Sequence, residues 1–278
     1  MPETTRALVL GSGGITGIAW ELGILAGLAE AGVRLTEADL VVGTSAGAVV
    51  GAELALGRPV EELYARQFEP ADTDRPLRTT PGMMVRYAGA MLPVRNATAG
   101  RVRLGRLALE ARDLPMAWPP RDSGSPSPAW PAGRRLVVAA VDAGSGRLRT
   151  FDAASGVDLT DAVSASHAVP LIWPPVAIDG RHYLDGGMRS PANADLAADA
   201  DRVVVLAPLT RAWRLADRPQ RQVAALPSGV ARLLVTPDRA ARRATGWNTL
   251  NAGKRPAAAL AGRAQAAAVA DAVRAVWS

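Results

Sequence analysis

Residues 40–57 read LVVGTSAGAVVGAELALG, an apolar run that passes through a glycine-framed turn into a segment of small residues. The first six residues are typical of a buried parallel strand, and residues 46–57 are typical of a helix. The same order occurs earlier, because residues 7–10 predict a strand and residues 17–31 have helical apolar spacing that ends before Gly32. This β-α-β-α opening predicts an α/β fold with a mainly parallel central sheet and helices on both faces.

Further strands are expected later in the chain. Residues 134–152 predict a hairpin that returns to the sheet. Two short strands are expected within residues 174–187, around the turn Asp179-Gly180, because Asp-Gly favours a tight hairpin turn. The run at residues 201–209, DRVVVLAPL, predicts another buried strand.

The chain is expected to form a single domain over residues 1–278, with a core at residues 5–210. Residues 61–112 are mostly helical in pattern. An insertion at residues 113–133 is rich in Pro, Ser and Gly, which predicts an exposed loop, either a lid or a surface insertion. Residues 211–278 are rich in Ala and Arg and predict a helical C-terminal extension.

The composition excludes several kinds of site. The 278 residues include no cysteine, so disulfides, thiolate metal sites and cysteine nucleophiles are excluded. Two histidines, His167 and His182, leave little room for a histidine-rich metal site. We therefore expect neither a metal ion nor a cofactor.

The chain is basic, with a formal net charge of +6 carried mostly by scattered arginines. Such a balance favours anionic partners, which means lipid headgroups or nucleic acid. An aromatic content of 4% and the lack of a nucleic-acid-binding motif argue against nucleic acid. No signal peptide or long apolar span is visible, which predicts a cytoplasmic protein. Peripheral contact with an anionic membrane surface and a generally solvated basic surface both remain open.

The pentapeptide GTSAG, from Gly43 to Gly47, fits the pattern G-x-S-x-G between a strand and a helix. A nucleophile at such a turn has a strained backbone, and its neighbours two residues away must lack side chains. Ser45 would then project at the carboxyl edge of the sheet, where the helix N-terminus favours developing negative charge. The alternative is a tight turn in which Ser45 only caps the helix.

Residues 11–17, GSGGITG, follow the first predicted strand. A dinucleotide-binding loop needs G-x-G-x-x-G, but the sixth position from Gly11 is Thr16, and the second strand does not end in an acidic residue. Nucleotide binding is therefore the weakest of our hypotheses. The favoured interpretation is a loop whose backbone N–H groups face an oxyanion, since glycines permit close approach.

A serine nucleophile needs a base, and three residues are candidates. Neither His167 nor His182 is followed by an obvious orienting acid, whereas Asp185 ends a strand and precedes two glycines. Asp185 can accept the hydroxyl proton as the C–O bond forms, provided that burial raises its basicity and the oxyanion is stabilised. The alternative role for Asp185 is that of a turn residue that bonds its own backbone.

Three motifs thus occur in order: a glycine-rich loop, G-x-S-x-G, and D-G-G. This order resembles the patatin-like phospholipases, lipid acyl hydrolases with a Ser-Asp dyad and a three-layer α/β/α fold. Residues 162–187, AVSASHAVPLIWPPVAIDGRHYLDGG, also resemble the segment that leads to the catalytic aspartate in that family. The resemblance covers roughly residues 5–210.

The resemblance implies a role for several positions. Ser45 matches the family nucleophile and Asp185 the dyad aspartate, while Gly13, Gly14 and the backbone of Ile15 match the oxyanion-hole donors. The glycines that support these motifs are Gly11, Gly17, Gly43, Gly47 and Gly186.

Two positions depart from the family pattern, because Ser12 replaces the first of three glycines and Thr16 replaces a basic residue. Our main hypothesis is a serine lipid acyl hydrolase, of the esterase or phospholipase A type, in which Ser45 and Asp185 cleave a fatty acyl ester. Its substrate would be a lipid or a small acyl ester. The alternative is a patatin-like protein that binds acyl groups or lipids with weak or no catalysis.

Overall fold

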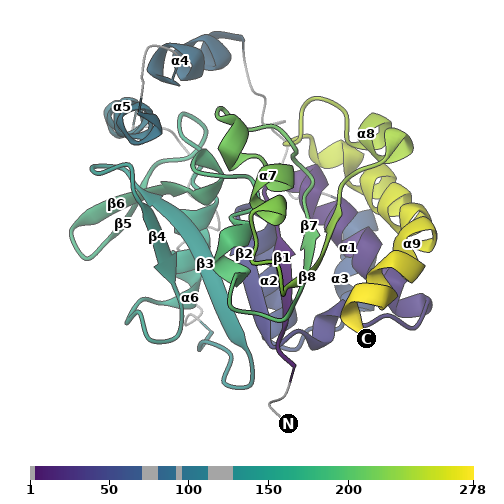
Figure 1. The fold of residues 1–278 in the computed structure, drawn as a ribbon. Helices are drawn as coiled ribbons and strands as arrows, with labels where there is room; N and C mark the ends of the chain where they lie inside the picture. Colours follow the sequence, from purple (N-terminus) through teal and green to yellow (C-terminus); the bar gives the residue numbers. More distant parts are fainter. Residues whose placement is uncertain (1–3, 71–80, 92–95, 112–127) are drawn as a thin grey trace.

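The computed structural model describes residues 4–70, 81–91, 96–111 and 128–278. Within them, an eight-stranded mixed sheet lies between helices (Figure 1). Its strands are β1 (Arg6–Leu10), β2 (Leu40–Thr44), β3 (Arg135–Asp142), β4 (Leu148–Phe151), β5 (Val176–Ile178), β6 (Arg181–Asp185), β7 (Arg202–Leu206) and β8 (Ala231–Val235). The strand order is β5-β6-β3-β2-β1-β7-β8, and β4 pairs with β3.

The parallel part of the sheet is formed by β3, β2, β1, β7 and β8, which pair in that order. The β3–β4, β3–β6 and β5–β6 pairs are antiparallel. Because β2 and β6 both pair with β3, the two strands that precede Ser45 and contain Asp185 are next-but-one neighbours in the sheet.

The helices are α1 (Gly14–Glu30), α2 (Ala46–Ala55), α3 (Val60–Ala65), α4 (Pro81–Met91), α5 (Ala97–Glu110), α6 (Leu159–Ser166), α7 (Pro219–Ala224), α8 (Arg239–Thr245) and α9 (Arg255–Trp277). Helices α1, α2 and α9 pack against one face of the sheet, and α7 packs against the other. This arrangement confirms the predicted α/β fold with helices on both faces.

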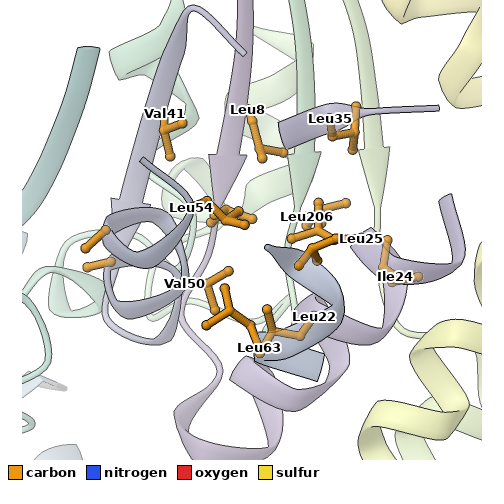
Figure 2. Packing of buried hydrophobic residues seen from close by; sticks show 14 of the residues in the cluster. Leu8, Leu22, Ile24, Leu25, Leu35, Val41, Val50, Leu54, Leu63 and Leu206 are labelled. Carbon is orange, nitrogen blue, oxygen red and sulfur yellow. The ribbon is translucent and has the colours of Figure 1, made fainter. Parts of the chain in front are cut away.

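Alternation along β1 divides the core between the two faces. Leu8 and Leu10 face the cluster formed with α1, α2 and α9, part of which Figure 2 shows. Ala7 and Val9 face the smaller cluster on the α7 side. Because both faces are covered, the strand is apolar from Ala7 to Leu10 rather than alternating with polar residues.

The predicted hairpin turn at Asp179-Gly180 is present between β5 and β6. Asp179 has a φ of 48° and Gly180 a φ of 72°, the two positive angles that a type I′ turn needs. The first helix differs slightly from the prediction, since α1 starts at Gly14 rather than at residue 17.

The C-terminal helix is confirmed as α9, which packs along α1, but residues 211–278 are not wholly helical. Strand β8 lies within this region and pairs in parallel with β7 along its whole length. Its sequence, ARLLV, consists mainly of good helix formers, so backbone pairing with β7 overrides local propensity. The region completes the sheet and its core.

The predicted insertion at residues 113–133 lies mostly outside the described residues. The prediction of a lid therefore falls on residues that the structure does not describe. The described end of the insertion begins at residue 128. There the Trp130 indole N–H donates a hydrogen bond to the carbonyl of Val157 at 2.7 Å, which fixes the return of the chain toward β3.

Candidate active site

Ser45 occupies the turn between β2 and α2, with φ 55° and ψ −116°. This left-handed conformation is strained for a residue with a side chain and is typical of a nucleophile elbow. A Cβ at Gly47 would lie 2.1 Å from the carbonyl oxygen of Leu10, and one at Gly43 would lie 2.6 Å from Cα of Ala48. Both framing glycines are therefore required by close backbone approach.

Asp185 lies at the end of β6 and directly contacts Ser45. The Ser45 hydroxyl donates to Oδ2 of Asp185 at 2.6 Å, and the Gly187 N–H donates to Oδ1 at 2.6 Å. Burial raises the pKa of Asp185 to about 7, although the hydrogen bonds from Ser45 and Gly187 act in the opposite direction. A carboxylate with this pKa is a much better proton acceptor near neutral pH than an ordinary aspartate.

Within the described residues, the Ser45 hydroxyl is hydrogen-bonded to Asp185 and to neither histidine. The Nδ1–H of His167 donates to the carbonyl of Val163 at 2.7 Å, and the ring packs edge-on against Trp173. His182 is an exposed residue of β6. The geometry therefore pairs Ser45 with the aspartate that the sequence analysis favoured.

The glycine-rich loop leaves three backbone N–H groups without an acceptor among the described residues: those of Gly13, Gly14 and Ile15. The flanking N–H groups are occupied, since the Ser12 N–H donates to Pro191 and the Thr16 N–H donates to Thr249. The three free donors are the positions that the family resemblance implies for the oxyanion hole. They lie at the N-terminus of α1, whose dipole favours negative charge.

The two departures from the family motif now have a structural context. Thr16 is fully buried, and its hydroxyl donates to the Thr249 carbonyl at 3.4 Å, so it binds the loop to the C-terminal region. The Ser12 hydroxyl is buried and has no hydrogen-bond partner within the described residues; it lies beside Gly187, where an added Cβ would be 2.5 Å from it.

A family model described as Patatin-like phospholipase matches residues 8–198, which is more than half of the chain. The match includes the glycine-rich loop, Ser45 and Asp185 in one continuous region. The chain belongs to the patatin-like phospholipase family.

The chain is also similar to individual proteins, at low sequence identity. A cUMP-AMP-activated phospholipase from Escherichia coli is 30% identical over 210 residues, which are 72% of this chain and 60% of that protein. The chain thus spans less than two thirds of that relative. Among solved structures, VipD from Legionella pneumophila matches 98% of this chain and 67% of its own, with a TM-score of 0.52 and 14% identity. The type III effector ExoU matches 98% of this chain and 54% of its own, with a TM-score of 0.46 and 18% identity.

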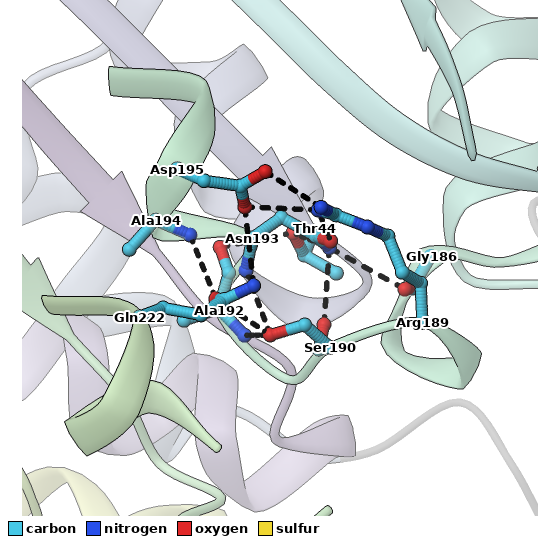
Figure 3. Close-up of polar contacts among 9 residues, drawn as sticks. All are labelled: Thr44, Gly186, Arg189, Ser190, Ala192, Asn193, Ala194, Asp195 and Gln222. Carbon is cyan, nitrogen blue, oxygen red and sulfur yellow. Dashed lines mark hydrogen bonds and ion pairs between the residues drawn. The ribbon is translucent and has the colours of Figure 1, made fainter. Parts of the chain in front are cut away.

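In this patatin-like chain, a network of buried hydrogen bonds connects the end of β2, which precedes Ser45, with the end of β6 at Asp185 (Figure 3). The Asn193 side-chain amide donates to the Thr44 hydroxyl at 3.1 Å and to the Gly186 carbonyl at 3.3 Å. Thr44 precedes Ser45, and Gly186 follows Asp185 in the chain. One buried amide therefore positions both strand ends, a role that no local sequence pattern indicated.

Ser166 is a second supporting residue, and in the sequence it is distinguished only by lying in the segment that resembles the family. Its hydroxyl accepts a hydrogen bond from the Ser45 N–H at 2.9 Å and donates to the Ala139 carbonyl at 2.7 Å. It thereby links the strained turn to β3 and satisfies a buried backbone donor. A buried serine at a helix end carries no distinguishing sequence signal.

Helix α4 lies close to the Asp185 side of the site. The Tyr87 hydroxyl donates to the Pro170 carbonyl at 2.6 Å. Burial, together with the charge of Asp185, raises the pKa of Tyr87, so this phenol stays protonated at any physiological pH. Leu171, next to Pro170, packs with Tyr87 in a small apolar cluster, which anchors α4 beside the candidate dyad.

Glu21 is a buried acid beneath the glycine-rich loop. Its Oε1 accepts a hydrogen bond from the Gly11 N–H at 2.9 Å, and its Oε2 has no partner in the part of the chain that the structure describes. Burial raises the pKa of Glu21 well above its usual value, and the bond from Gly11 offsets this only in part. The side chain supports the loop at the cost of burying a carboxyl group.

We expect Glu21→Gln to raise the thermal unfolding midpoint at about pH 8, because the amide oxygen keeps the bond to Gly11 without a buried ionisable group. The raised pKa means that the folded chain holds this proton while the unfolded chain releases it, so wild-type stability falls as pH rises. The gain should therefore shrink toward about pH 4. Unfolding monitored by circular dichroism would check this, with the exposed Glu61→Gln as control. A lower midpoint for Glu21→Gln at about pH 8 would contradict the assignment.

Among the described residues, no group of three or more His, Asp or Glu side chains is placed to hold a metal ion. No helix in the described ranges is long and apolar enough to cross a membrane.

Proposed function

We propose that the chain is a serine lipid acyl hydrolase that uses Ser45 and Asp185 as a dyad. The observation that carries the proposal is the 2.6 Å hydrogen bond from the Ser45 hydroxyl to a buried carboxylate with a raised pKa. Membership of the patatin-like phospholipase family supports the same reaction class.

In the first half of the reaction, Ser45 Oγ attacks the acyl carbonyl carbon while its proton moves to Oδ2 of Asp185. The carbonyl oxygen becomes an oxyanion that the N–H groups of Gly13, Gly14 and Ile15 stabilise. Collapse of this intermediate breaks the ester C–O bond, and Asp185 returns the proton to the leaving alcohol. The product is an acyl ester on Ser45.

In the second half, water attacks the acyl-enzyme and Asp185 takes one of its protons. The same three N–H groups stabilise the second oxyanion. Collapse releases the fatty acid, and the proton returns from Asp185 to Ser45 Oγ. Each proton taken is given back, so the cycle consumes one water and needs no cofactor.

The test is a hydrolysis screen of the wild-type chain against phospholipids, lysophospholipids, triacylglycerols and p-nitrophenyl esters of short and long chain length. We expect release of free fatty acid from at least one glycerolipid, measured by mass spectrometry. Binding of acyl chains without any release would instead favour the catalytically weak alternative.

A further inference from the structure

Two C-terminal segments, residues 207–218 after β7 and residues 246–251 after α8, are hydrogen-bonded to the glycine-rich loop. On one side, the Leu209 N–H donates to the Ser12 carbonyl at 3.2 Å. On the other side, the Thr16 N–H donates to the Thr249 carbonyl at 3.0 Å. In Figure 1 these segments follow β7 and α8 at the end of the sheet opposite the N-terminus.

These segments expose four large apolar side chains, of which Leu209 belongs to a residue bonded to the loop and Trp247 lies two residues before Thr249. Trp247 is 82% exposed, Leu215 53%, Trp213 45% and Leu209 38%. They are half of the eight large apolar side chains that are exposed in the described part of the chain. Since a chain spans at most about 3.6 Å per residue, Trp247 lies within roughly 8 Å of Thr249 along the backbone. We call these four side chains the rim surface.

The surroundings of the rim surface are basic. Six exposed arginines lie on the same segments or on α8 and have no ion-pair partner in the described ranges: Arg211, Arg214, Arg218, Arg239, Arg242 and Arg243. At the opposite end of the sheet, Arg6 pairs with Asp39 and Arg34 pairs with Glu37, whereas the exposed Arg135 has no ion pair in the described ranges. On these two segments and α8, the arginines are accompanied by one acidic residue, Asp217, so positive charge is in excess there.

We propose that the rim surface docks on an anionic phospholipid bilayer and presents the Ser45 site to membrane lipid, a proposal that rests on the proposed function. Indole rings prefer the headgroup level of a membrane, and arginines bind lipid phosphates. Exposed apolar residues surrounded by basic residues are typical of peripheral membrane contacts. A symmetric contact with a second copy is disfavoured, because it would place one basic surface against another.

Binding should be measured by vesicle sedimentation, with Ser45→Ala as the common background so that lipid is not consumed. Vesicles of phosphatidylcholine alone are compared with vesicles that also contain phosphatidylglycerol. We expect binding mainly to the anionic vesicles. Trp213→Ala with Trp247→Ala, and separately Arg211→Gln with Arg243→Gln, should each weaken it about tenfold or more.

The matched control changes Leu56 and Arg135, an exposed apolar and an exposed basic residue at the amino edge of the sheet. Leu56→Ala with Arg135→Gln should leave vesicle binding unchanged. With Ser45 intact, the tryptophan pair should reduce hydrolysis of vesicle lipid about tenfold more than hydrolysis of monomeric p-nitrophenyl butyrate.

Three results would overturn the docking proposal: no binding of the background protein to anionic vesicles, equal losses in the control variant, or a dimer that only the rim variants dissociate. The proposed function fails separately, if vesicles are bound through the rim surface but neither vesicle lipid nor soluble ester is hydrolysed by the wild-type chain.

Discussion

Ser45→Ala lowers ester hydrolysis about 10⁴-fold or more, to a residual rate that binding and the oxyanion donors alone can support. The loss is expected because no other hydroxyl occupies the strained turn against Asp185. The 2.6 Å hydrogen bond to Asp185 is the only one that the Ser45 hydroxyl makes within the described residues. The measurement is kcat/KM for a p-nitrophenyl ester and for the best lipid from the screen.

The control for this variant is Ser164→Ala, since Ser164 is a buried serine of α6 outside the candidate dyad. It should keep most of the wild-type activity. Hydrolysis by Ser45→Ala within about tenfold of wild type would exclude Ser45 as the nucleophile.

Asp185→Asn lowers turnover about 10⁴-fold, because an amide cannot accept the serine proton. The fold should survive, since the amide oxygen can still accept the Gly187 N–H that now bonds to Oδ1. For wild type, only the ionised form of Asp185 is an effective base. With its pKa raised to about 7, wild-type kcat/KM should rise with pH through that region and level off above it.

Asp185→Asn should raise the stability of the folded chain, although it lowers turnover. Between about pH 4 and 7 the folded wild type holds a proton on Asp185 that the unfolded chain has released, so its free energy of unfolding falls as pH rises. A shift from 3.8 to about 7 corresponds to roughly 3 to 5 kcal/mol. Relative to wild type, Asp185→Asn should therefore gain that much stability from about pH 4 to about pH 8.

Asp142→Asn is the matched control for the stability measurement. Although burial acts to raise it, hydrogen bonds from Ser145 and Arg181 lower the pKa of Asp142. The ionised Asp142 carboxylate therefore stabilises the folded chain at neutral pH, and this stabilisation is lost on acidification. Asp142→Asn should accordingly be less stable than wild type at neutral pH. A pH-independent difference between wild type and Asp185→Asn would contradict the raised pKa of Asp185.

The local sequence predicted the parts of the molecule that local geometry controls. The turn from β2 into α2 was predictable because Gly43 and Gly47 are required by steric contact. The Asp179-Gly180 hairpin was predictable because the turn demands positive φ at both positions. Asp185 could be chosen over both histidines from its place at a strand end before two glycines.

Other features depend on contacts between distant segments. Asn193 and Ser166 support the site through hydrogen bonds to β2, β3 and the turn at Ser45, and neither has a local motif. Glu21 looks like an ordinary helix residue until α1 places it under Gly11. Strand β8 depends on pairing with β7, which composition rich in Ala, Arg and Leu does not indicate.

The proposed mechanism requires Ser45 as the nucleophile and Asp185 as its base. The most direct measurement is covalent labelling of the wild-type chain with a fluorophosphonate, followed by peptide mapping, at a series of pH values from about 5 to 9. We predict one adduct, on Ser45, that forms faster as pH rises through about 7 and hardly forms in Asp185→Asn. An adduct on another serine, or equally fast labelling of Ser45 in Asp185→Asn, would contradict this mechanism.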